Sequence, residues 1–530
     1  MDLGRALSWT AERFPENVAV VADERSYTYR EWDVRTNRLA RAFGACGAGR
    51  GQRVVLAMAN GEQHAAAHMA AQKLGALSTP LNVRFSVDEL AYCLGDAEPA
   101  VVVTDDATSA VMREALDGLE SPRDFTVLHA GEDPPADAEA LEELAASQSA
   151  SAPEAEVGES DASVMLYTSG TTGRPKGVPR THRNEFSAAL AHVVQARYGP
   201  GESTLGAMPM YHTMGLRSLL SMIVIGGTFV AMPVFKPERA VELIEAEKIS
   251  SLYLVPTAFW ALLQHGGLPE AGRSVTKLAY AGAAMTSSLT EELAEAVEPE
   301  VFVNHYGSTE VYTFSIEEDA LARPDSAGRP GIHSRLRLVR AEAEERVGPD
   351  ELVESGETGE IVVSLESDEA FAGYWRRPDA DEKALREGWY FTGDLGFFGE
   401  DGRLRVAGRV DDMIITGGEN VHPLEVEDAL GRCPRVAEVA VAGVEHEKWG
   451  QEVTAFIVAD DAAGAGETAM AVADWARESS GLTSYKRPRR VVVLEEIPKS
   501  PVGKILRRKL VAGEFEALAD SSEAQEVPPR

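Results

Sequence analysis

Short apolar runs that end in turns alternate with helical stretches along most of this chain. "RVVLAMANG" precedes a helical stretch from Glu62 to Leu74, and "SVMLY" precedes another from Asn184 to Arg197. Continuous apolar runs of this length are typical of strands buried on both faces of a parallel sheet, with helices as the crossovers. The alternation therefore predicts an α/β fold in which parallel sheets are covered by helices.

Two later runs, "KLAYAGAAM" and "VFVNHYGSTE", also end in loops of small and polar residues. In open parallel sheets, ligands bind at the carboxyl ends of the strands. We therefore expect the loops after "SVMLY", "KLAYA" and "VFVNH" to meet at one common site.

The chain has 530 residues, which is too long for a single hydrophobic core. Its character changes after Gly408, where a smaller α+β unit of ordinary domain size begins. We predict an N-terminal domain over 1–410, a C-terminal domain over 411–516 and a disordered tail over 517–530.

The charge is strongly acidic, with 51 Lys+Arg against 85 Asp+Glu and a formal net charge of -34. Such a surface repels nucleic acids and anionic membranes, so we expect neither as a general partner. The most membrane-like stretch runs from Leu219 to Phe235, but Gly226 and Gly227 interrupt it. It is interpreted as a buried helix that turns into a buried strand, with no integral membrane segment.

Cys46, Cys93 and Cys433 are widely spaced and form no metal-binding pair, which favours a reducing compartment. The N-terminus lacks the basic start and apolar core of a secretory signal. Together these features predict a cytoplasmic protein.

The segment "TSGTTGRPKG", from Thr168 to Gly177, has the composition of a phosphate-binding loop. A P-loop requires G-x-x-x-x-G-K-[S/T]. Counted from Gly170, the second glycine is replaced by Pro175, and Lys176 is followed by glycine rather than by a hydroxyl residue. The segment therefore predicts a phosphate site of another kind.

Five segments occur in a fixed order: "YTSGTTGRPKG", "YGSTE", "YFTGD", "GRVDDMIITGGENVHP" and "PKSPVGKILRR". In this order they resemble the signature motifs of the adenylate-forming superfamily. "MPMYHTMGL", "EHEKWGQEV" and "YKRPRRVVVLEEIPKS" are most similar to its acyl- and aryl-CoA synthetase branch, which includes chlorobenzoate-CoA ligase and medium- and long-chain fatty acid-CoA ligases.

The resemblance implies an acid-thiol ligase that uses ATP, Mg²⁺ and CoA. A small-molecule carboxylic acid reacts with ATP to give an acyl-adenylate and pyrophosphate, and CoA then releases AMP. It also implies a large N-terminal domain with a distorted β-barrel subdomain and a small, mobile C-terminal domain hinged at Asp411. A homodimer is compatible with this resemblance.

The resemblance assigns roles to residues of the nucleotide site. Phosphate binding falls to Thr168, Ser169, Gly170, Thr171, Thr172, Gly173 and Lys176. AMP binding falls to Gly282, Ala283, Ala284, Tyr306, Gly307, Asp394 and Arg409. Thr309 contacts the α-phosphate, Glu310 holds Mg²⁺, and Lys504 reaches the carboxylate and the α-phosphate during adenylation.

The chemistry of these residue types agrees with those roles. Backbone N–H groups and hydroxyls bind phosphate oxygens, and a carboxylate suits a hard cation that bridges phosphates. "GEDG" predicts a hairpin turn that leaves Asp394 and Arg409 near the same end of two paired strands. A surface ion pair is the alternative explanation for these two residues.

In the second half-reaction the resemblance implies that the C-terminal domain rotates and admits the thiol of CoA. The predicted CoA-binding residues are Gly417, Gly418, Glu419, Asn420, Trp449, Tyr485, Lys486, Arg487 and Arg84. Basic residues in "YKRPRR" suit the polyanionic nucleotide end of CoA, and a solvated basic face is the alternative interpretation.

The predicted acyl pocket contains His212, Met214, Thr257, Phe259 and Tyr312. Amino-acid-activating relatives place an acidic residue shortly after the segment at His212, and "HTMGLRSLLSMIVIGG" contains none. We therefore expect an apolar aryl or aliphatic acid. A ligase that loads the pantetheine of a carrier protein shares every motif and stays open as the alternative, and a non-catalytic binding protein on this fold is a more remote one.

Overall fold

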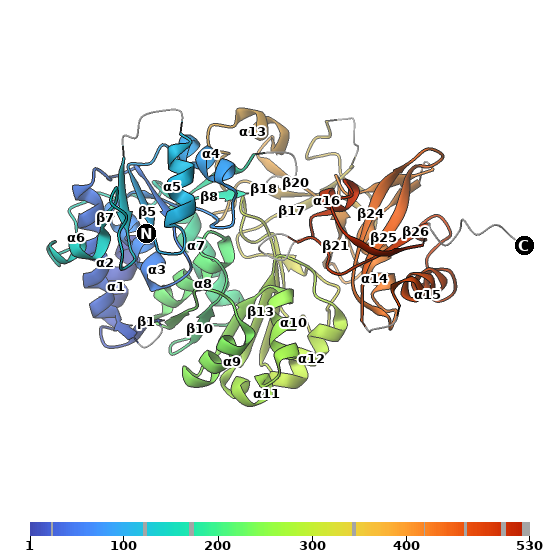
Figure 1. Cartoon of the computed structure of the whole chain (residues 1–530), viewed down its shortest axis with the longest axis horizontal. Coiled ribbons are helices and arrows are strands. Elements are labelled where there is room, and N and C mark those ends of the chain that lie inside the picture. The colour runs from blue at the N-terminus through green and yellow to red at the C-terminus, as the bar shows by residue number, and fades with distance from the viewer. Residues whose placement is uncertain are drawn as a thin grey trace, which may run out of the picture. The chain divides into compact units, whose positions relative to one another are not determined.

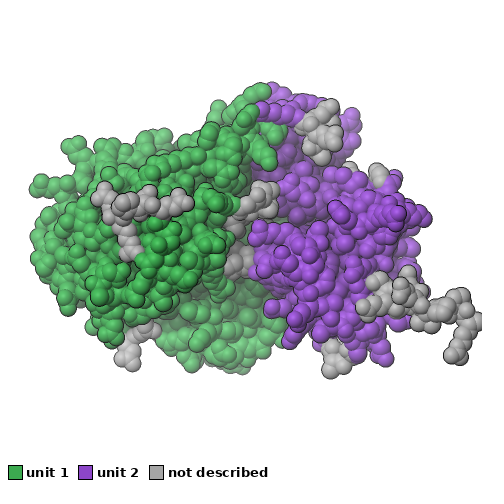
Figure 2. Space-filling model, turned by 45° about the horizontal axis from the view of Figure 1, so that its top comes forward, with its two compact units in different colours: residues 1–336, 363–390 green, residues 337–362, 391–530 purple. Residues whose placement is uncertain are grey.

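The computed structural model describes residues 1–22, 25–119, 125–168, 174–341, 346–417, 419–460, 464–499 and 505–521. Contacts between Cα atoms divide the chain into two compact units (Figure 2). Unit 1 comprises Met1–Leu336 and Val363–Tyr390, and unit 2 comprises Arg337–Val362 and Phe391–Arg530. The division falls within three strands rather than at a single linker.

Unit 1 contains a seven-stranded sheet and a nine-stranded sheet, with helices packed against their strands (Figure 1). The seven-stranded sheet has the order β7 (Glu139–Ala140), β6 (Thr126–His129), β5 (Val101–Thr104), β3 (Arg53–Ala57), β4 (Leu77–Pro80), β8 (Ala162–Thr168), β9 (Lys176–Thr181). Its strands pair in parallel except for the antiparallel pair β8–β9.

The nine-stranded sheet has the order β16 (Arg329–Pro330), β15 (Ser315–Glu317), β14 (Val301–Tyr306), β13 (Lys277–Ala281), β12 (Ser251–Leu254), β10 (Ser203–Gly206), β11 (Thr228–Ala231), β1 (Val18–Ala22), β2 (Arg25–Thr28). From β14 to β1 the strands pair in parallel. All four residues of β5 and of β10 are buried, as expected for strands covered on both faces.

The helices of unit 1 are α1 (Leu3–Arg13), α2 (Tyr29–Ala45), α3 (Glu62–Leu74), α4 (Val87–Ala97), α5 (Ser109–Asp117), α6 (Leu141–Ala146), α7 (His182–Gln195), α8 (Thr213–Ile225), α9 (Pro237–Ala246), α10 (Pro256–His265), α11 (Leu268–Ala271), α12 (Ser287–Val297) and α13 (Pro378–Ala384), with a 3₁₀ turn at Gly272–Ser274. α7 begins with a capping box between Thr181 and Asn184. α8 ends at Gly226, whose φ of 69° is the left-handed conformation that glycine adopts without strain.

A five-stranded sheet corresponds to the predicted β-barrel subdomain. Its strands are β17 (Leu336–Val339), β18 (Gly359–Ser364), β20 (Trp389–Phe398) and β19 (Leu385–Arg386), with β21 (Leu404–Arg409) paired to β20. The β20–β21 hairpin turns through "GEDG" as predicted and pairs Asp394 with Arg409.

The C-terminal part of unit 2 is an α+β domain. Its sheet comprises β23 (Glu419–Val421), β22 (Ile414–Thr416), β25 (Gly450–Ala459), β26 (Arg490–Leu494) and β27 (Ala517–Asp520), with β24 (Val436–His446) paired to β25. Its helices are α14 (Pro423–Leu430), α15 (Ala465–Glu478) and α16 (Arg507–Val511). Apolar residues of β25, β26 and α15 form its core, including Val453, Val491 and Val472.

The α/β class and the layered order predicted from the sequence are confirmed. β8 lies in the seven-stranded sheet whereas β13 and β14 lie in the nine-stranded sheet, so the loops expected to meet at one site leave two different sheets. One expectation needs correction. The predicted disordered tail begins too early, because Ala517–Asp520 forms β27 and pairs antiparallel with β26.

The stretch from Leu219 to Phe235 turns from α8 into β11, as its glycines predict. Among the helices of the described part of the chain, none has both the length and the apolar character needed to cross a bilayer.

Candidate active site

The predicted phosphate segment connects the two strands of the β8–β9 hairpin. Thr168, the last residue of β8, pairs in register with Lys176, the first residue of β9, and the Thr168 hydroxyl donates to the Lys176 carbonyl at 3.5 Å. Ser169, Gly170, Thr171, Thr172 and Gly173 lie outside the described residues. Because the segment joins two antiparallel strands, it differs from a P-loop, which joins a strand to a helix.

The loop after β14 carries Thr309 and Glu310. The Ser308 hydroxyl accepts hydrogen bonds from the Glu310 N–H at 3.2 Å and the Val311 N–H at 3.4 Å, which curls this loop into a tight turn. Glu310 is only 7 % exposed, and the Tyr374 hydroxyl donates to its Oε1 at 2.7 Å. A buried carboxylate with such a partner is held in one orientation.

Lys176 and Glu310 share Tyr374 as a neighbour. The Nζ of Lys176 lies 4.3 Å from the centroid of the Tyr374 ring, and the hydroxyl of the same tyrosine donates to Glu310. Burial lowers the pKa of the Lys176 ammonium below its ordinary value, and the Glu310 carboxylate opposes that shift. A predicted phosphate ligand and the predicted cation ligand are thus brought together from two different sheets, through a tyrosine that sequence reasoning missed.

Arg180 supports the Glu310 loop from within the protein. Its Nε pairs with Glu185 Oε1 at 2.5 Å, and its Nη1 donates to the carbonyls of Thr309, Glu310 and Glu369 at 3.2, 3.3 and 2.9 Å. The side chains of Arg180 and Glu185 are essentially inaccessible to solvent. Sequence reasoning also missed this pair, although an arginine inside a buried strand, followed five residues later by a glutamate, was an available signal.

The predicted adenine site lies at the ends of two neighbouring strands. Ala281 of β13 pairs in register with His305 of β14, so Gly282, which follows β13, is next to Tyr306, the last residue of β14. Gly282 has a φ of 88°, and Ala283 and Ala284 after it are exposed. The half-buried Tyr306 ring packs edge-on against Phe314, with their centroids 5.1 Å apart.

The predicted ribose-binding pair belongs to unit 2. Asp394 and Arg409 face each other across β20 and β21, and Arg409 Nη1 lies 2.6 Å from Asp394 Oδ1. Both side chains are partly buried, with exposed fractions of 16 % for Asp394 and 27 % for Arg409. The ion pair expected as the alternative is therefore present, and it leaves both side chains within reach of solvent.

The predicted acyl residues differ in their surroundings. His212 is the N-cap of α8, where its Nδ1 accepts a hydrogen bond from the Met214 N–H at 3.4 Å. Met214, Phe259 and Tyr312 are buried, whereas Thr257 is exposed.

Tyr312 has a cationic environment that the sequence did not indicate. The guanidinium carbon of Arg180 lies 3.5 Å from the centroid of the Tyr312 ring, and that of Arg217 lies 5.1 Å from it. Arg217 donates to the Thr313 hydroxyl at 3.2 Å and faces the buried Glu369 at 3.6 Å. The carboxylate of Glu369 balances the charge of Arg217 here.

Basic residues of "YKRPRR" are divided among separate partners. Lys486 pairs with Glu425 at 2.6 Å, and Arg487 Nε donates to the Leu482 carbonyl at 3.0 Å. The guanidinium carbon of Arg489 lies 4.3 Å from the centroid of the Trp449 ring. Within the fold, Lys486 is thus paired with a carboxylate and Arg487 is bound to a backbone carbonyl.

The remaining predicted CoA and hinge residues have simpler surroundings. Gly417, with a φ of 61°, donates its N–H to the Trp449 carbonyl at 2.9 Å. Tyr485 packs against the domain core, and Glu419 and Asp411 are exposed, as is Arg84 in unit 1. Gly418 and Lys504, and the side chain of Asn420, lie outside the part of the molecule that the structure describes.

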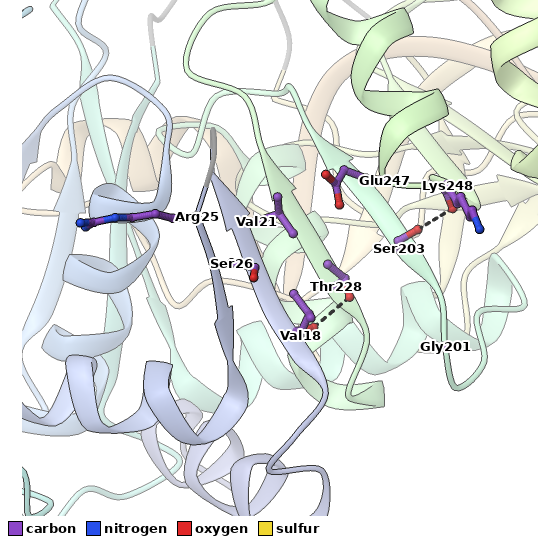
Figure 3. Close-up of a pocket in the computed structure, with 9 residues that line it drawn as sticks. All are labelled: Val18, Val21, Arg25, Ser26, Gly201, Ser203, Thr228, Glu247 and Lys248. Atoms are coloured by element: carbon purple, nitrogen blue, oxygen red, sulfur yellow. Dashed lines mark hydrogen bonds between the residues drawn. The ribbon is translucent and has the colours of Figure 1, made fainter.

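A pocket of about 590 Å³ lies elsewhere in unit 1, at the edge formed by β1, β2, β10 and β11 (Figure 3). Its walls are held by hydrogen bonds from Ser203 to the Lys248 carbonyl and from Thr228 to the Val18 carbonyl. None of the nine described residues that line it belongs to the predicted site, and Figure 3 shows Arg25 extending away from Glu247 and Lys248. We assign no chemistry to it.

Comparison with known proteins agrees with this geometry. A 4-chlorobenzoate–CoA ligase from Arthrobacter sp is 33% identical over 525 residues, covering 95% of this chain and 94% of that protein. The long-chain-fatty-acid–CoA ligase FadD13 from Mycobacterium tuberculosis is 33% identical over 488 residues, covering 91% and 92%. The crystal structure of ATP-bound MatB from Rhodopseudomonas palustris is 27% identical, with a TM-score of 0.83 and coverage of 97% and 99%.

Two sequence models match the chain along most of its length. The model of the AMP-binding enzyme matches residues 7–375, and the model of the AMP-binding enzyme C-terminal domain matches residues 425–504. The first match includes Lys176, Tyr306 and Glu310 of the predicted nucleotide site, together with Tyr374, which contacts Lys176 and Glu310. The chain therefore belongs to the AMP-binding enzyme family.

Proposed function

We propose that this chain is an ATP-dependent carboxylate–CoA ligase that forms AMP and pyrophosphate. The observation that carries the proposal is the near full-length similarity to proteins named as CoA ligases, at 33% identity over 95% of the chain. In the first half-reaction a carboxylate oxygen attacks the α-phosphorus of ATP and pyrophosphate leaves. In the second, the CoA thiol attacks the acyl carbon and AMP leaves.

The residues of unit 1 provide what the first half-reaction needs. Two anions must approach each other, so positive charge and N–H donors have to offset their repulsion. Lys176 supplies charge at the end of the phosphate segment, and Thr168 and the residues up to Gly173 supply hydroxyl and N–H donors. Tyr306 offers a ring face to adenine beside Gly282, where the small residues permit close approach.

Mg²⁺ is proposed to accompany ATP and to be held by Glu310. Mg²⁺ prefers oxygen ligands and commonly binds through one or two carboxylates together with substrate phosphates and water. Glu310 fits this role because, within the described part of the chain, the one hydrogen bond to its carboxylate is that from Tyr374 to Oε1, and 7 % of the residue is exposed. When bound, the cation would offset the negative charge of the phosphates, and Thr309 beside it would contact the α-phosphate.

The residues of unit 2 are proposed to serve both half-reactions. Asp394 would accept hydrogen bonds from the ribose hydroxyls, with Arg409 holding its carboxylate in place at 2.6 Å. Lys504 would reach the carboxylate and the α-phosphate during adenylation. Rotation at Asp411 would then bring residues 417–420 and Trp449 close to the pantetheine arm. Lys486 and Arg487, together with Arg84 of unit 1, would contact the nucleotide end of CoA.

The proposed substrate is an apolar aryl or aliphatic acid. Met214, Phe259 and Tyr312 are buried, and the predicted pocket segment contains no acidic residue that could hold an ammonium group. The two relatives named above act, by their names, on 4-chlorobenzoate and on long-chain fatty acids. A cytoplasmic location and a homodimer stay predictions.

A panel of carboxylic acids with ATP, Mg²⁺ and CoA tests the proposal. We expect at least one aryl or aliphatic acid to yield AMP, pyrophosphate and a thioester. ADP and inorganic phosphate as products would contradict the adenylation chemistry. Replacing CoA with a phosphopantetheinylated carrier protein in the same assay distinguishes the alternative acceptor.

A further inference from the structure

The segment from Ala370 to Trp375 lies between the two loops that build the nucleotide site. On one side, Ala370 forms an isolated bridge with Val311, and the Phe371 N–H donates to the Glu310 carbonyl at 2.9 Å. This segment is therefore attached to the backbone of the loop that carries Glu310.

On its other side the segment is attached to the phosphate hairpin. The Trp375 N–H donates to the Gly177 carbonyl at 2.8 Å, and a Cβ added at Gly177 would approach Trp375 Cβ to 3.1 Å. The Trp375 indole also donates to the Asp96 carbonyl at 3.0 Å. Gly177 directly follows Lys176, so Tyr374 sits between the two charged residues of the site.

The backbone and ring of Tyr374 are themselves well anchored. Gly373 before it has a φ of 145°, and the Tyr374 N–H donates to Asp381 Oδ1 at 2.8 Å. The ring packs edge-on against Phe371, with a centroid distance of 5.0 Å, and the side chain is 6 % exposed. Such an anchored side chain can orient its neighbours rather than follow them.

Tyr374 contacts the two charges with two different parts of its side chain. The hydroxyl donates to Glu310 Oε1 at 2.7 Å, while the ring carries the Lys176 ammonium at 4.3 Å. The phenol O–H is the donor of this hydrogen bond, and the ionised carboxylate can only accept it.

Lys176 and Glu310 do not neutralise each other directly. Within the described part of the chain no ion pair of 4.0 Å or less joins them, although each contacts the same tyrosine. Each charged group therefore contacts the tyrosine, the ammonium at its ring and the carboxylate at its hydroxyl. A direct Lys–Glu ion pair would instead have to be broken before either residue could bind a ligand.

We propose that Tyr374 is a positioning residue for nucleotide and cation binding, which fixes the carboxylate of Glu310 through its hydroxyl and the ammonium of Lys176 through its ring. The inference rests on the proposed function, because Glu310 and Lys176 are assigned to Mg²⁺ and phosphate there. The proposal assigns separate roles to the hydroxyl and to the ring, and these roles can be tested by different substitutions.

Tyr374→Phe removes the hydroxyl and keeps the ring, and Tyr374→Leu removes both. Binding of Mn²⁺ together with α,β-methylene-ATP, followed by electron paramagnetic resonance, reports on the site without turnover. We expect Tyr374→Phe to weaken Mn²⁺ binding roughly ten-fold, the size typical of losing a hydrogen bond to a charged group. Tyr374→Leu should weaken nucleotide binding further, because Lys176 loses its cation–π partner.

Tyr29→Phe is the matched control for stability. Tyr29 is fully buried in the helical core of unit 1, and its hydroxyl donates to the carbonyls of Met222 at 2.9 Å and Gly227 at 2.8 Å. It should lower the melting midpoint at least as much as Tyr374→Phe and leave Mn²⁺ binding at the wild-type value.

A second readout separates positioning from general destabilisation. When the acyl-adenylate is supplied, Tyr374→Phe should form the thioester with CoA at close to the wild-type rate. The rate at which it adenylates the carboxylic acid with ATP should fall roughly ten-fold. Wild-type Mn²⁺ and nucleotide binding in Tyr374→Phe, or equal loss of both half-reactions, overturns the proposal. If no acid is adenylated by the wild type but Mn²⁺ binding still depends on the hydroxyl, the positioning role holds and the ligase assignment fails.

Discussion

At Gly307 the backbone leaves no room for a side chain. A Cβ there would lie 2.1 Å from the carbonyl oxygen of Tyr312 and 3.1 Å from that of Val311. The close approach exists because the Ser308 N–H donates to the Val311 carbonyl at 3.0 Å and the Phe314 N–H to the Tyr306 carbonyl at 2.8 Å. A single missing methyl group thus lets the chain fold back and present Thr309 and Glu310.

Gly307→Ala should displace the Thr309–Glu310 turn and impair adenylation. A shift of about 1 Å in a positioned group can lower a rate by roughly 10²-fold, so we expect a loss of that order in kcat/KM for ATP. Steady-state assays with a saturating acid measure it.

Gly95→Ala is the control for that substitution. Gly95 lies in α4 with open space around it, and alanine there should stabilise the helix by about 0.5–1 kcal/mol with unchanged kinetics. Normal ATP kinetics in Gly307→Ala would show that the turn tolerates the methyl group.

Three elements meet around a pair of buried histidines. His192 of α7 and His305 of β14 have ring centroids 4.8 Å apart, and the Tyr253 ring of β12 lies 4.6 Å from His192. Both histidines are almost fully buried, and no hydrogen-bond partner is found for either ring nitrogen of either histidine among the residues that the structure describes. Burial, and then the nearby charge of Arg217, lower the pKa of His305 well below 6.5.

This pair predicts a loss of stability in acid. A histidine with a lowered folded-state pKa binds its proton more readily in the unfolded chain, so its contribution is complete above about pH 6.5 and declines as pH falls below it. His305→Leu removes one such group. Between pH 7.5 and 5.5, its free energy of unfolding should fall by about 1.4 kcal/mol less than that of the wild type.

Urea unfolding at the two pH values measures the difference. Tyr253→Phe, in the same cluster, is the control, because tyrosine does not titrate in this range. It should lower stability equally at both pH values. An identical pH dependence in His305→Leu and the wild type would mean that His305 is not held neutral by the fold.

At the scale of the whole molecule, the chain forms two compact units, and the domain boundary predicted at residue 410 stays a prediction. Contacts assign 337–362 and 391–530 to unit 2, whereas the matched C-terminal sequence model begins at residue 425. The contact division begins inside the five-stranded sheet, and Asp411 follows β21 in an exposed turn. A hinge at Asp411 stays a prediction.

The two half-reactions should be separable by mutation of unit 2. Lys504 is assigned to adenylation only, so Lys504→Ala should slow acyl-adenylate formation roughly 10²- to 10³-fold while sparing thioester formation from a supplied acyl-adenylate. Gly418→Leu, which fills the proposed pantetheine tunnel, and Asp411→Pro, which fixes φ at the proposed hinge, should do the reverse.

Single-turnover assays of each half-reaction distinguish these outcomes. Equal slowing of both steps by Lys504→Ala, or normal thioester formation in Gly418→Leu, would contradict a mechanism with two orientations. The melting midpoint of each variant is compared with that of the wild type. An unchanged midpoint shows that a slower half-reaction is not caused by a general loss of folding.

Features with local signals could be predicted from the sequence. Apolar runs with their turns predicted the parallel strands, Gly226 predicted the end of α8, and "GEDG" predicted the hairpin that pairs Asp394 with Arg409. Local signals suffice here because strand burial, helix termination and tight turns depend on neighbouring residues.

The contacts that hold the predicted site together join residues that are distant in the sequence, and they became visible in the three-dimensional structure. Tyr374 is 64 residues from Glu310, and Arg180 is 129 residues from Thr309, yet these contacts fix the orientation of the predicted ligands. The tertiary structure also placed β8 and β14 in different sheets and engaged Lys486 and Arg487 within the fold. Hydrogen bonds and buried charge pairs need a partner at a particular position in space. A sequence pattern predicts the local backbone conformation of a residue, but it does not predict which distant segment of the chain packs against that residue.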